Sequence, residues 1–151
     1  MEYEINKDTL AIIPVDFEKS KILELKHEYL IEERSFRIIE ESCKYFGSSY
    51  EGRFQGTKKL IGVTHKSPIV IEESSKIIFF PTTSSLRHDC IWISLGNIKN
   101  YFPGNNFDTS IVEFNNGEKI ELDMSYGSLT NQILRATRLK VVLIDRINKN
   151  I

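Results

Sequence analysis

The strongest constraint on the fold is a stretch in which apolar and polar residues alternate on both sides of a turn signal. Ser110–Phe114 and Lys119–Leu122 both alternate, and Asn115-Asn116-Gly117 lies between them. Alternation at a period of two places one side of a strand against a core. Asn-Gly supplies the positive φ angles that a tight hairpin needs. The sequence therefore predicts an antiparallel pair of strands here.

Other segments also have the length and composition of strands. They are rich in Ile, Leu, Val and Phe, and several are bounded by proline, which cannot donate a ladder hydrogen bond. The expected strands are residues 9–13, 21–26, 60–64, 69–71, 77–80, 90–94 and 98–102.

A helical period replaces the alternation in two places. Apolar residues recur at steps of three, four and three from Phe36 to Phe46, which is one stripe of a helix. Ser35 is the expected N-cap and Gly47 the expected stop. A second helix is expected over residues 128–147, opened by Ser128, with one apolar side. The opposite side of that helix carries Arg135, Arg138, Arg146 and Lys149.

These elements predict an α+β fold: a mainly antiparallel sheet that could curl into a barrel, with two packed helices. No repeat, linker or low-complexity tract interrupts the chain, so we expect a single domain over residues 1–151. No apolar run reaches the roughly 20 residues of a membrane span, and the start lacks the pattern of a signal peptide. Cys43 and Cys90 lie among apolar neighbours and are expected to be reduced, buried thiols of a cytoplasmic protein.

The net charge of −1 argues mildly against nucleic-acid binding, but the charges are unevenly distributed. Residues 1–42 and 103–134 have net charges of −5 and −4, whereas residues 43–102 and 135–151 each have +4. Because exposed charges are screened beyond about 8 Å, the local field decides whether a polyanion is attracted. Ordinary solvated faces are the open alternative.

Three segments combine glycine or hydroxyl residues with basic ones. Residues 42–57 hold three glycines together with hydroxyls and Arg53, residues 80–94 hold four successive hydroxyls and Arg87, and residues 64–69 hold Lys66. We expect the first two to form loops in which glycine permits close approach, while hydroxyls and arginine suit phosphate oxygens or groove edges. A plain polar loop is the alternative. Neither the P-loop nor the dinucleotide-binding glycine pattern is present.

Together these segments resemble the competence transcription factor (ComK) family. Three runs carry the resemblance: Cys-x-x-Phe-Gly-Ser-Ser-Tyr-x-Gly-Arg from Cys43, Phe-Pro-Thr-x-Ser-Ser-x-Arg from Phe80, and Cys-x-Trp-Ile-Ser from Cys90. The hairpin turn and Asn131-Gln132 with Arg135 continue the match, which covers roughly residues 8–148.

The resemblance implies an activator of DNA-uptake and recombination genes, without enzymatic activity or cofactor. It implies binding to paired A/T-rich boxes of double-stranded DNA through the minor groove, as dimers that form tetramers. RNA polymerase and a proteolytic adaptor are implied partners, and a cytoplasmic, nucleoid-associated location is expected. The candidate DNA-binding residues are Ser48, Ser49, Tyr50, Arg53, Lys58, Lys59, Lys66, Ser84, Ser85, Arg87, Arg135 and Arg138.

Arginine is drawn to the narrow groove of A/T-rich DNA. We therefore expect Arg53 and Arg87 to converge from two loops into the minor groove, with lysines and serines on phosphates. Some positions depart from the family pattern: Glu51 lies inside the first run, and Thr64 and Ser67 stand where Ser and Pro are usual. The chain stops at Ile151, so a short form without the usual C-terminal extension is expected.

Two alternatives stay open. A non-activating relative could act through mixed dimers with a full-length activator, which the near-zero net charge and Glu51 favour. A zinc site could be built from Cys43, His65, His88 and Cys90, although their spacing lacks an accepted ligand pattern. No hydrolase motif accompanies the serines and histidines.

Overall fold

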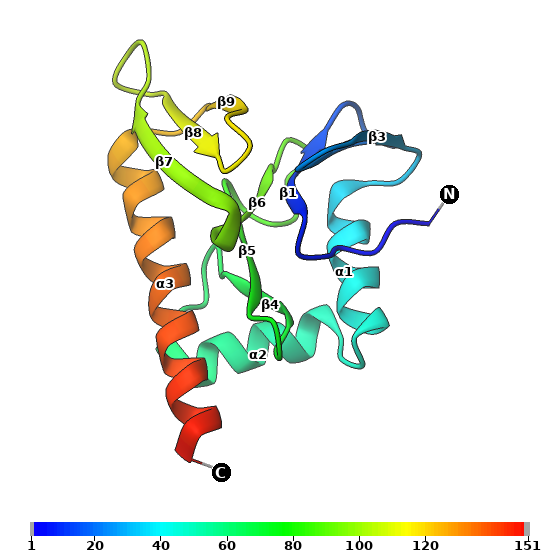
Figure 1. Cartoon of the computed structure of the whole chain (residues 1–151), viewed down its shortest axis with the longest axis vertical. Helices are drawn as coiled ribbons and strands as arrows, with labels where there is room; N and C mark the ends of the chain where they lie inside the picture. Colours follow the sequence, from blue (N-terminus) through cyan, green and yellow to red (C-terminus); the bar gives the residue numbers. More distant parts are fainter. Residues whose placement is uncertain (1, 150–151) are drawn as a thin grey trace.

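The computed structural model describes residues 2–149 and contains two antiparallel sheets with three α-helices (Figure 1). The larger sheet has the strand order β3-β2-β1-β6-β5-β4, and the smaller has the order β7-β8-β9. The strands of the larger sheet are β1 (Thr9–Pro14), β2 (Ser20–Glu24), β3 (Glu28–Ile31), β4 (Ile69–Glu72), β5 (Ile77–Pro81) and β6 (Trp92–Ser94). The remaining elements are β7 (Ile98–Pro103), β8 (Ser110–Phe114), β9 (Lys119–Leu122), the 3-10 turn η1 (Leu95–Asn97), and helices α1 (Ser35–Tyr45), α2 (Tyr50–Ile61) and α3 (Tyr126–Lys149).

The central strands of the larger sheet are buried on both faces. In β5, Ile78 and Phe80 belong to the core cluster that contains the apolar side of α3 and the hairpin of β8 and β9. Phe79, between them, belongs to the opposite cluster, which contains Ile38 and Ile39 of α1. Successive side chains of a strand point to opposite faces, so a strand buried on both reads as a continuous apolar run.

The α+β prediction is confirmed, with two corrections. Both sheets are open, each with two edge strands, so the larger sheet does not close into a barrel. A third helix, α2, crosses below the sheet between α1 and α3 (Figure 1). It contributes Phe54 to one core cluster and Ile61 to the other.

The predicted hairpin is confirmed. Val112 of β8 pairs with Ile120 of β9, and Gly117 adopts a φ of 88°, as the turn requires. The expected strands over 9–13, 21–26, 69–71, 77–80, 90–94 and 98–102 are present with small shifts at their ends. The strand expected over 60–64 is wrong, because Leu60 and Ile61 form the last turn of α2.

Both expected helix starts are shifted, because the serines concerned have other partners. Arg34 occupies the N-cap position of α1, and the Oγ of Ser35 instead shares a hydrogen bond with the Oγ of Ser20, 2.8 Å away. At the start of α3, the Oγ of Ser125 accepts from the backbone N–H of Ser128, so Ser128 lies inside the first turn. Gly47 follows α1 with a φ of 84°, as expected for a helix stop.

The two cysteines are free and buried, as predicted. Burial raises the pKa of the Cys43 thiol to about 11 and also raises the pKa of Cys90. In residues 2–149, no helix combines the length and the apolar character that a membrane span needs.

Candidate nucleic-acid interface

Arg53 lies on a helix and is held by an acidic residue, which corrects the expectation of a loop arginine. Ser49 caps α2 by accepting from the N–H of Gly52, so the Gly-rich segment continues as a helix. The Nη1 of Arg53 lies 2.6 Å from the Oε1 of Glu73, and the arginine side chain is only 14% exposed. Its Nε is buried and finds no acceptor among residues 2–149. Arg53 therefore ties α2 to the turn between β4 and β5.

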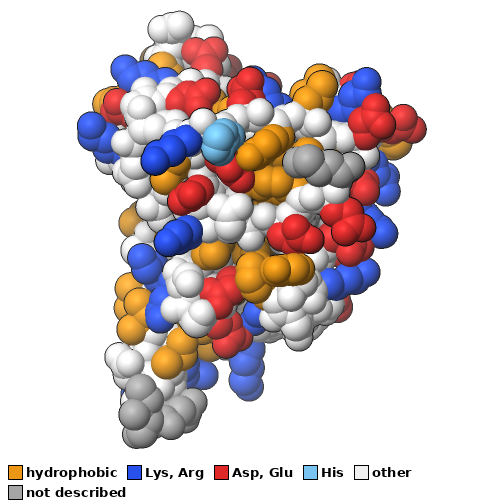
Figure 2. Space-filling model, turned by 45° about the vertical axis from the view of Figure 1, so that its right-hand side comes forward, with side chains coloured by type: hydrophobic (Ala, Val, Ile, Leu, Met, Phe, Trp, Pro, Cys, Tyr) orange, Lys and Arg blue, Asp and Glu red, His pale blue; other side chains and the backbone are white. Residues whose placement is uncertain are grey.

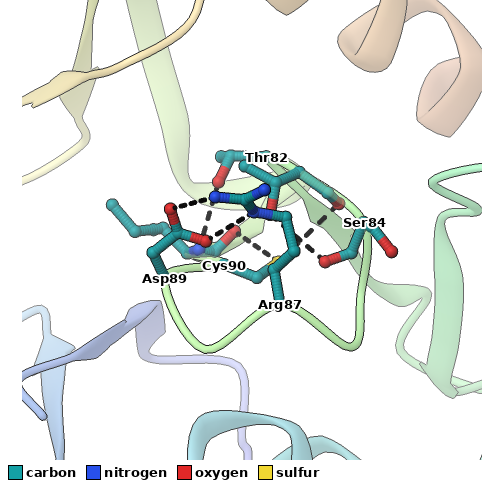
Figure 3. Close-up of polar contacts among 7 residues, drawn as sticks. Thr82, Ser84, Arg87, Asp89 and Cys90 are labelled. Carbon is teal, nitrogen blue, oxygen red and sulfur yellow. Dashed lines mark hydrogen bonds and ion pairs between the residues drawn. The ribbon is translucent and has the colours of Figure 1, made fainter. Parts of the chain in front are cut away.

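Arg87 also has an acidic partner, but on the surface. Figure 3 shows its guanidinium turned back over its own loop toward Asp89, with Nε and Nη2 donating to the two carboxylate oxygens at 2.9 and 3.0 Å. The two side chains are 59% and 50% exposed. This hydrogen bonding lowers the pKa of Asp89 and raises the pKa of Arg87.

Main-chain and threonine hydrogen bonds hold the loop that carries Arg87. The N–H of Thr82 donates to the carbonyl of Ile91, and the N–H of Ile91 donates back to the Oγ1 of Thr82. The N–H of Arg87 donates to the carbonyl of Ser84. The loop is thus closed at its base, while Ser84 and Arg87 face solvent.

The expected convergence of the two arginines is not found. The partner of Arg53, Glu73, lies in the turn before β5, whereas Arg87 lies in the loop after β5. The two guanidinium groups are therefore bound at opposite ends of this strand. The two segments meet instead at Tyr50, whose hydroxyl donates to the Oγ of Ser85 at 3.2 Å.

Tyr50 and its serine neighbours build the scaffold of this region. The ring of Tyr50 packs edge-on against Phe36, with centroids 4.7 Å apart, and burial raises the pKa of its hydroxyl. Ser49 is occupied as the cap of α2, while Ser48 and Ser85 are half-buried. The first two motif segments are thus in contact through Tyr50 and Ser85.

The remaining cationic candidates are exposed and have no acidic partner within residues 2–149. Lys58 and Lys59 lie in the last turn of α2, Lys66 lies in the loop that follows, and Arg135 and Arg138 lie one turn apart on α3. No acidic oxygen in residues 2–149 lies within 4.0 Å of their charged nitrogens. The Nη1 of Arg135 donates to the carbonyl of His65 at 3.2 Å, which joins α3 to the loop.

We call these five residues, Lys58, Lys59, Lys66, Arg135 and Arg138, the basic face. They belong to two sequence segments, 54–71 and 124–144, that contain no Asp or Glu. The two segments pack together, with Ile61 and Leu139 in one core cluster, and neither segment has an acidic residue that would neutralise these charges. The face that carries α1 differs: Figure 2 shows acidic and basic side chains intermixed over it.

Gln132 belongs to this region but was absent from the candidate residues predicted from sequence. Its side chain is 3% exposed, and its Nε2 donates to the carbonyls of Lys66 and Pro81 at 2.9 and 2.8 Å. The sequence carries a signal for it, because a glutamine between the apolar positions Leu129 and Ala136 faces the core, where a polar group needs partners.

The zinc alternative lacks its ligand group. Within the described part of the chain, no three His, Cys, Asp or Glu side chains are grouped as they would be around a metal ion. The buried Cys90 donates weakly to the carbonyls of Thr83 and Ile91, so its sulfur packs inside the loop.

Comparisons with known proteins show the family of this chain. The family model described as "ComK protein" matches residues 1–148. A curated relative, the "Competence transcription factor" of Bacillus subtilis (strain 168), is 38% identical over 152 residues, covering 99% of this chain and 79% of the relative. No solved structure matches the chain. On this evidence the chain belongs to the ComK protein family.

Proposed function

We propose that this protein is a ComK-type transcription regulator that binds double-stranded, A/T-rich DNA through the basic face. Membership of the ComK family and similarity to a protein named competence transcription factor support a transcription regulator. The proposal places the protein in the cytoplasm, at the nucleoid, and requires neither cofactor nor catalysis.

The observation that carries the proposal is that the five cations of the basic face are exposed and have no acidic partner among residues 2–149. An exposed Lys or Arg without an acidic partner can bind a phosphate without first losing an ion pair. Lys21, Arg37 and Lys44, in contrast, already have glutamate partners at 3.7 Å or less. The local excess of positive charge compensates for a net charge of −1 over the whole chain.

Arg87 is the arginine that we propose to enter the minor groove. Its ion pair with Asp89 is exposed, and such pairs contribute little to stability because water and salt screen both charges, so DNA can displace the carboxylate. A narrow A/T-rich groove has a strongly negative potential that attracts a guanidinium. Arg53 is not available in the same way, because its side chain is mostly buried against Glu73. We therefore assign Arg53 to the scaffold.

The candidate residues with hydroxyl groups also divide into a proposed DNA contact and residues of the scaffold. Ser84 is exposed beside Arg87 and is proposed to contact a phosphate, which would fix the register of the loop on the duplex. Ser49 and Tyr50 are already engaged in the helix cap and in the contact with Ser85. Their proposed role is to hold the loop against α2.

A titration of an A/T-rich duplex and a G·C-substituted duplex, followed by fluorescence anisotropy at several salt concentrations, tests the proposal. Five phosphate contacts predict a log–log salt slope of about −4 to −5, together with tighter binding to the A/T-rich duplex. Equal binding to both duplexes, or an affinity that does not change with salt, would contradict it.

A matched pair of double variants locates the surface. Lys58→Ala with Lys59→Ala removes two free cations, so the magnitude of the salt slope should fall by about 2. Arg37→Ala with Lys44→Ala removes the same charge from α1, where both side chains pair with Glu41. That control should leave the salt slope unchanged. An equal fall of the slope in both double variants would show that only the total charge matters, and would contradict the assignment of binding to the basic face.

A second candidate function is a non-activating relative that forms mixed dimers with a longer activator. Leu134 and Val141 favour it, because they are exposed, apolar and two turns apart on the same side of α3. Sedimentation of the protein alone and with a full-length relative distinguishes homodimers or tetramers from mixed dimers. Contacts with RNA polymerase or a proteolytic adaptor are further proposals that rest on the family alone.

A further inference from the structure

Gln132 joins two chain segments that carry candidate DNA contacts. The two N–H groups of its amide donate to the carbonyl of Lys66 and to the carbonyl of Pro81, from the second turn of α3. These acceptors lie 66 and 51 residues away in the sequence. Its Oε1 accepts from the Nη1 of Arg135 at 3.4 Å. Both amide donors of this buried side chain therefore reach other segments of the chain, while its oxygen is used within α3.

Each acceptor controls the position of a candidate contact. Lys66 has a positive φ of 50°, a conformation that a lysine adopts rarely and that the surroundings must hold. Pro81 is the last residue of β5, directly before the loop that carries Ser84 and Arg87. Arg135 is held both by Gln132 and by the carbonyl of His65.

We infer that Gln132 is a positioning residue that fixes the distance between Lys66 and the Arg87 loop, so that both meet one DNA duplex together. The inference rests on the proposed function. Phosphates along a duplex have a fixed spacing, so contacts from two flexible loops reinforce each other only when the loops are held at a matching distance. A primary amide suits this task because it donates twice and accepts with its oxygen.

Asn97 provides a matched control within the same molecule. Its buried amide donates to the carbonyls of Lys7 and Thr9, both at 3.0 Å, and thereby joins η1 to the start of β1 and the residues just before it. None of the candidate DNA contacts lies in these segments. Loss of the Asn97 amide should therefore destabilise the protein as loss of the Gln132 amide does, without changing the basic face.

A double-mutant cycle tests the inference with the full chain and the A/T-rich duplex. Lys66→Met alone should weaken binding by about 3- to 10-fold and reduce the magnitude of the salt slope by about 1. In a Gln132→Met background, where Lys66 is no longer held in register, the same change should cost less than about 2-fold. In an Asn97→Leu background it should retain its full effect.

Equal effects of Lys66→Met in the Gln132→Met and Asn97→Leu backgrounds would overturn the inference, because Gln132 would then be only structural. If Gln132→Met does not fold, Gln132→Asn replaces it, since a shorter amide cannot reach both carbonyls. Hydrogen exchange without DNA gives an independent readout: residues 62–68 and 82–91 should both lose protection in the Gln132 variant. Unchanged protection of either segment would also overturn it.

Failure of the proposed function gives a different result. A wild-type protein that binds neither duplex would overturn DNA binding, and with it the role of Gln132 toward DNA, whatever the exchange data show. A wild-type protein that binds the A/T-rich duplex with the expected salt slope, but shows no coupling between Gln132 and Lys66, would overturn the positioning role alone.

Discussion

The two motif arginines have similar partners in different surroundings. Arg53 pairs with Glu73 through a side chain that is 14% exposed, whereas Arg87 pairs with Asp89 through a side chain that is 59% exposed. A mostly buried guanidinium that loses its carboxylate becomes an unpaired charge in a poor solvent, but an exposed one regains water. The same residue type in two neighbouring motifs therefore has a structural task in one and is available for binding in the other.

The largest expected effect is on stability and comes from the pair of Arg53 and Glu73, in which the arginine side chain is mostly buried and the glutamate is exposed. Arg53→Met should lower the free energy of unfolding by about 1–3 kcal/mol, because it removes the contact between α2 and the β4–β5 turn. The folded variant should bind the A/T-rich duplex within about 2-fold of wild type, since the basic face is intact. Urea unfolding and anisotropy measure the two quantities. A stable Arg53→Met variant that has lost DNA binding would show that Arg53 is needed for binding and has no structural task.

The exposed pair should behave in the opposite way. Arg87→Ala should weaken binding to the A/T-rich duplex by about 10-fold, the effect of losing one well-placed groove contact of 1–3 kcal/mol. Its free energy of unfolding should stay close to that of wild type, as for most surface substitutions. Arg37→Ala on α1 is the control for charge. If Arg87→Ala lowers the free energy of unfolding as much as Arg53→Met does, both arginines have a structural task and the distinction between the two ion pairs is wrong.

A smaller gain of binding is expected from the partner of Arg87. Asp89→Asn removes the carboxylate that competes with DNA for the guanidinium, so affinity should rise by about 2- to 5-fold at low salt. The gain should shrink as salt rises, because salt already screens the pair. Anisotropy at two salt concentrations measures both. A loss of affinity would instead make Asp89 an orienting partner of Arg87 during binding.

The smallest effect is the dependence of stability on pH through Asp89. Arg87 lowers the pKa of this carboxyl, so between the folded and unfolded pKa values the unfolded chain binds more protons and stability rises with pH. The contribution is complete above the unfolded pKa of about 3.9 and is lost as pH falls through the lowered value. The difference in urea midpoint between wild type and Asp89→Asn should therefore stay constant from pH 5 to pH 8. A midpoint difference that changes between pH 5 and pH 8 would contradict this assignment.

Local patterns determined a large part of the structure. The Asn-Gly turn, the apolar alternation around it and the amphipathic stripe of α3 depend only on neighbours in the sequence, and each predicted its element correctly. The two acid-free segments, 54–71 and 124–144, can also be read directly from the chain. The α2 helix was missed because Gly52 and Gly56 favour loops, whereas the Ser49 cap and the burial of Thr57 and Ile61 support a helix.

Only the tertiary structure decided which candidate residues are free to bind. Arg53 and Glu73 are 20 residues apart, and Gln132 reaches carbonyls 51 and 66 residues away. Such partners are brought together by strand register and by the packing of α2 and α3, which short-range patterns do not encode. Sequence alone thus determined where the cations and turns lie along the chain. Packing determined which cations are neutralised, because an ion pair or a buried amide depends on neighbours in space.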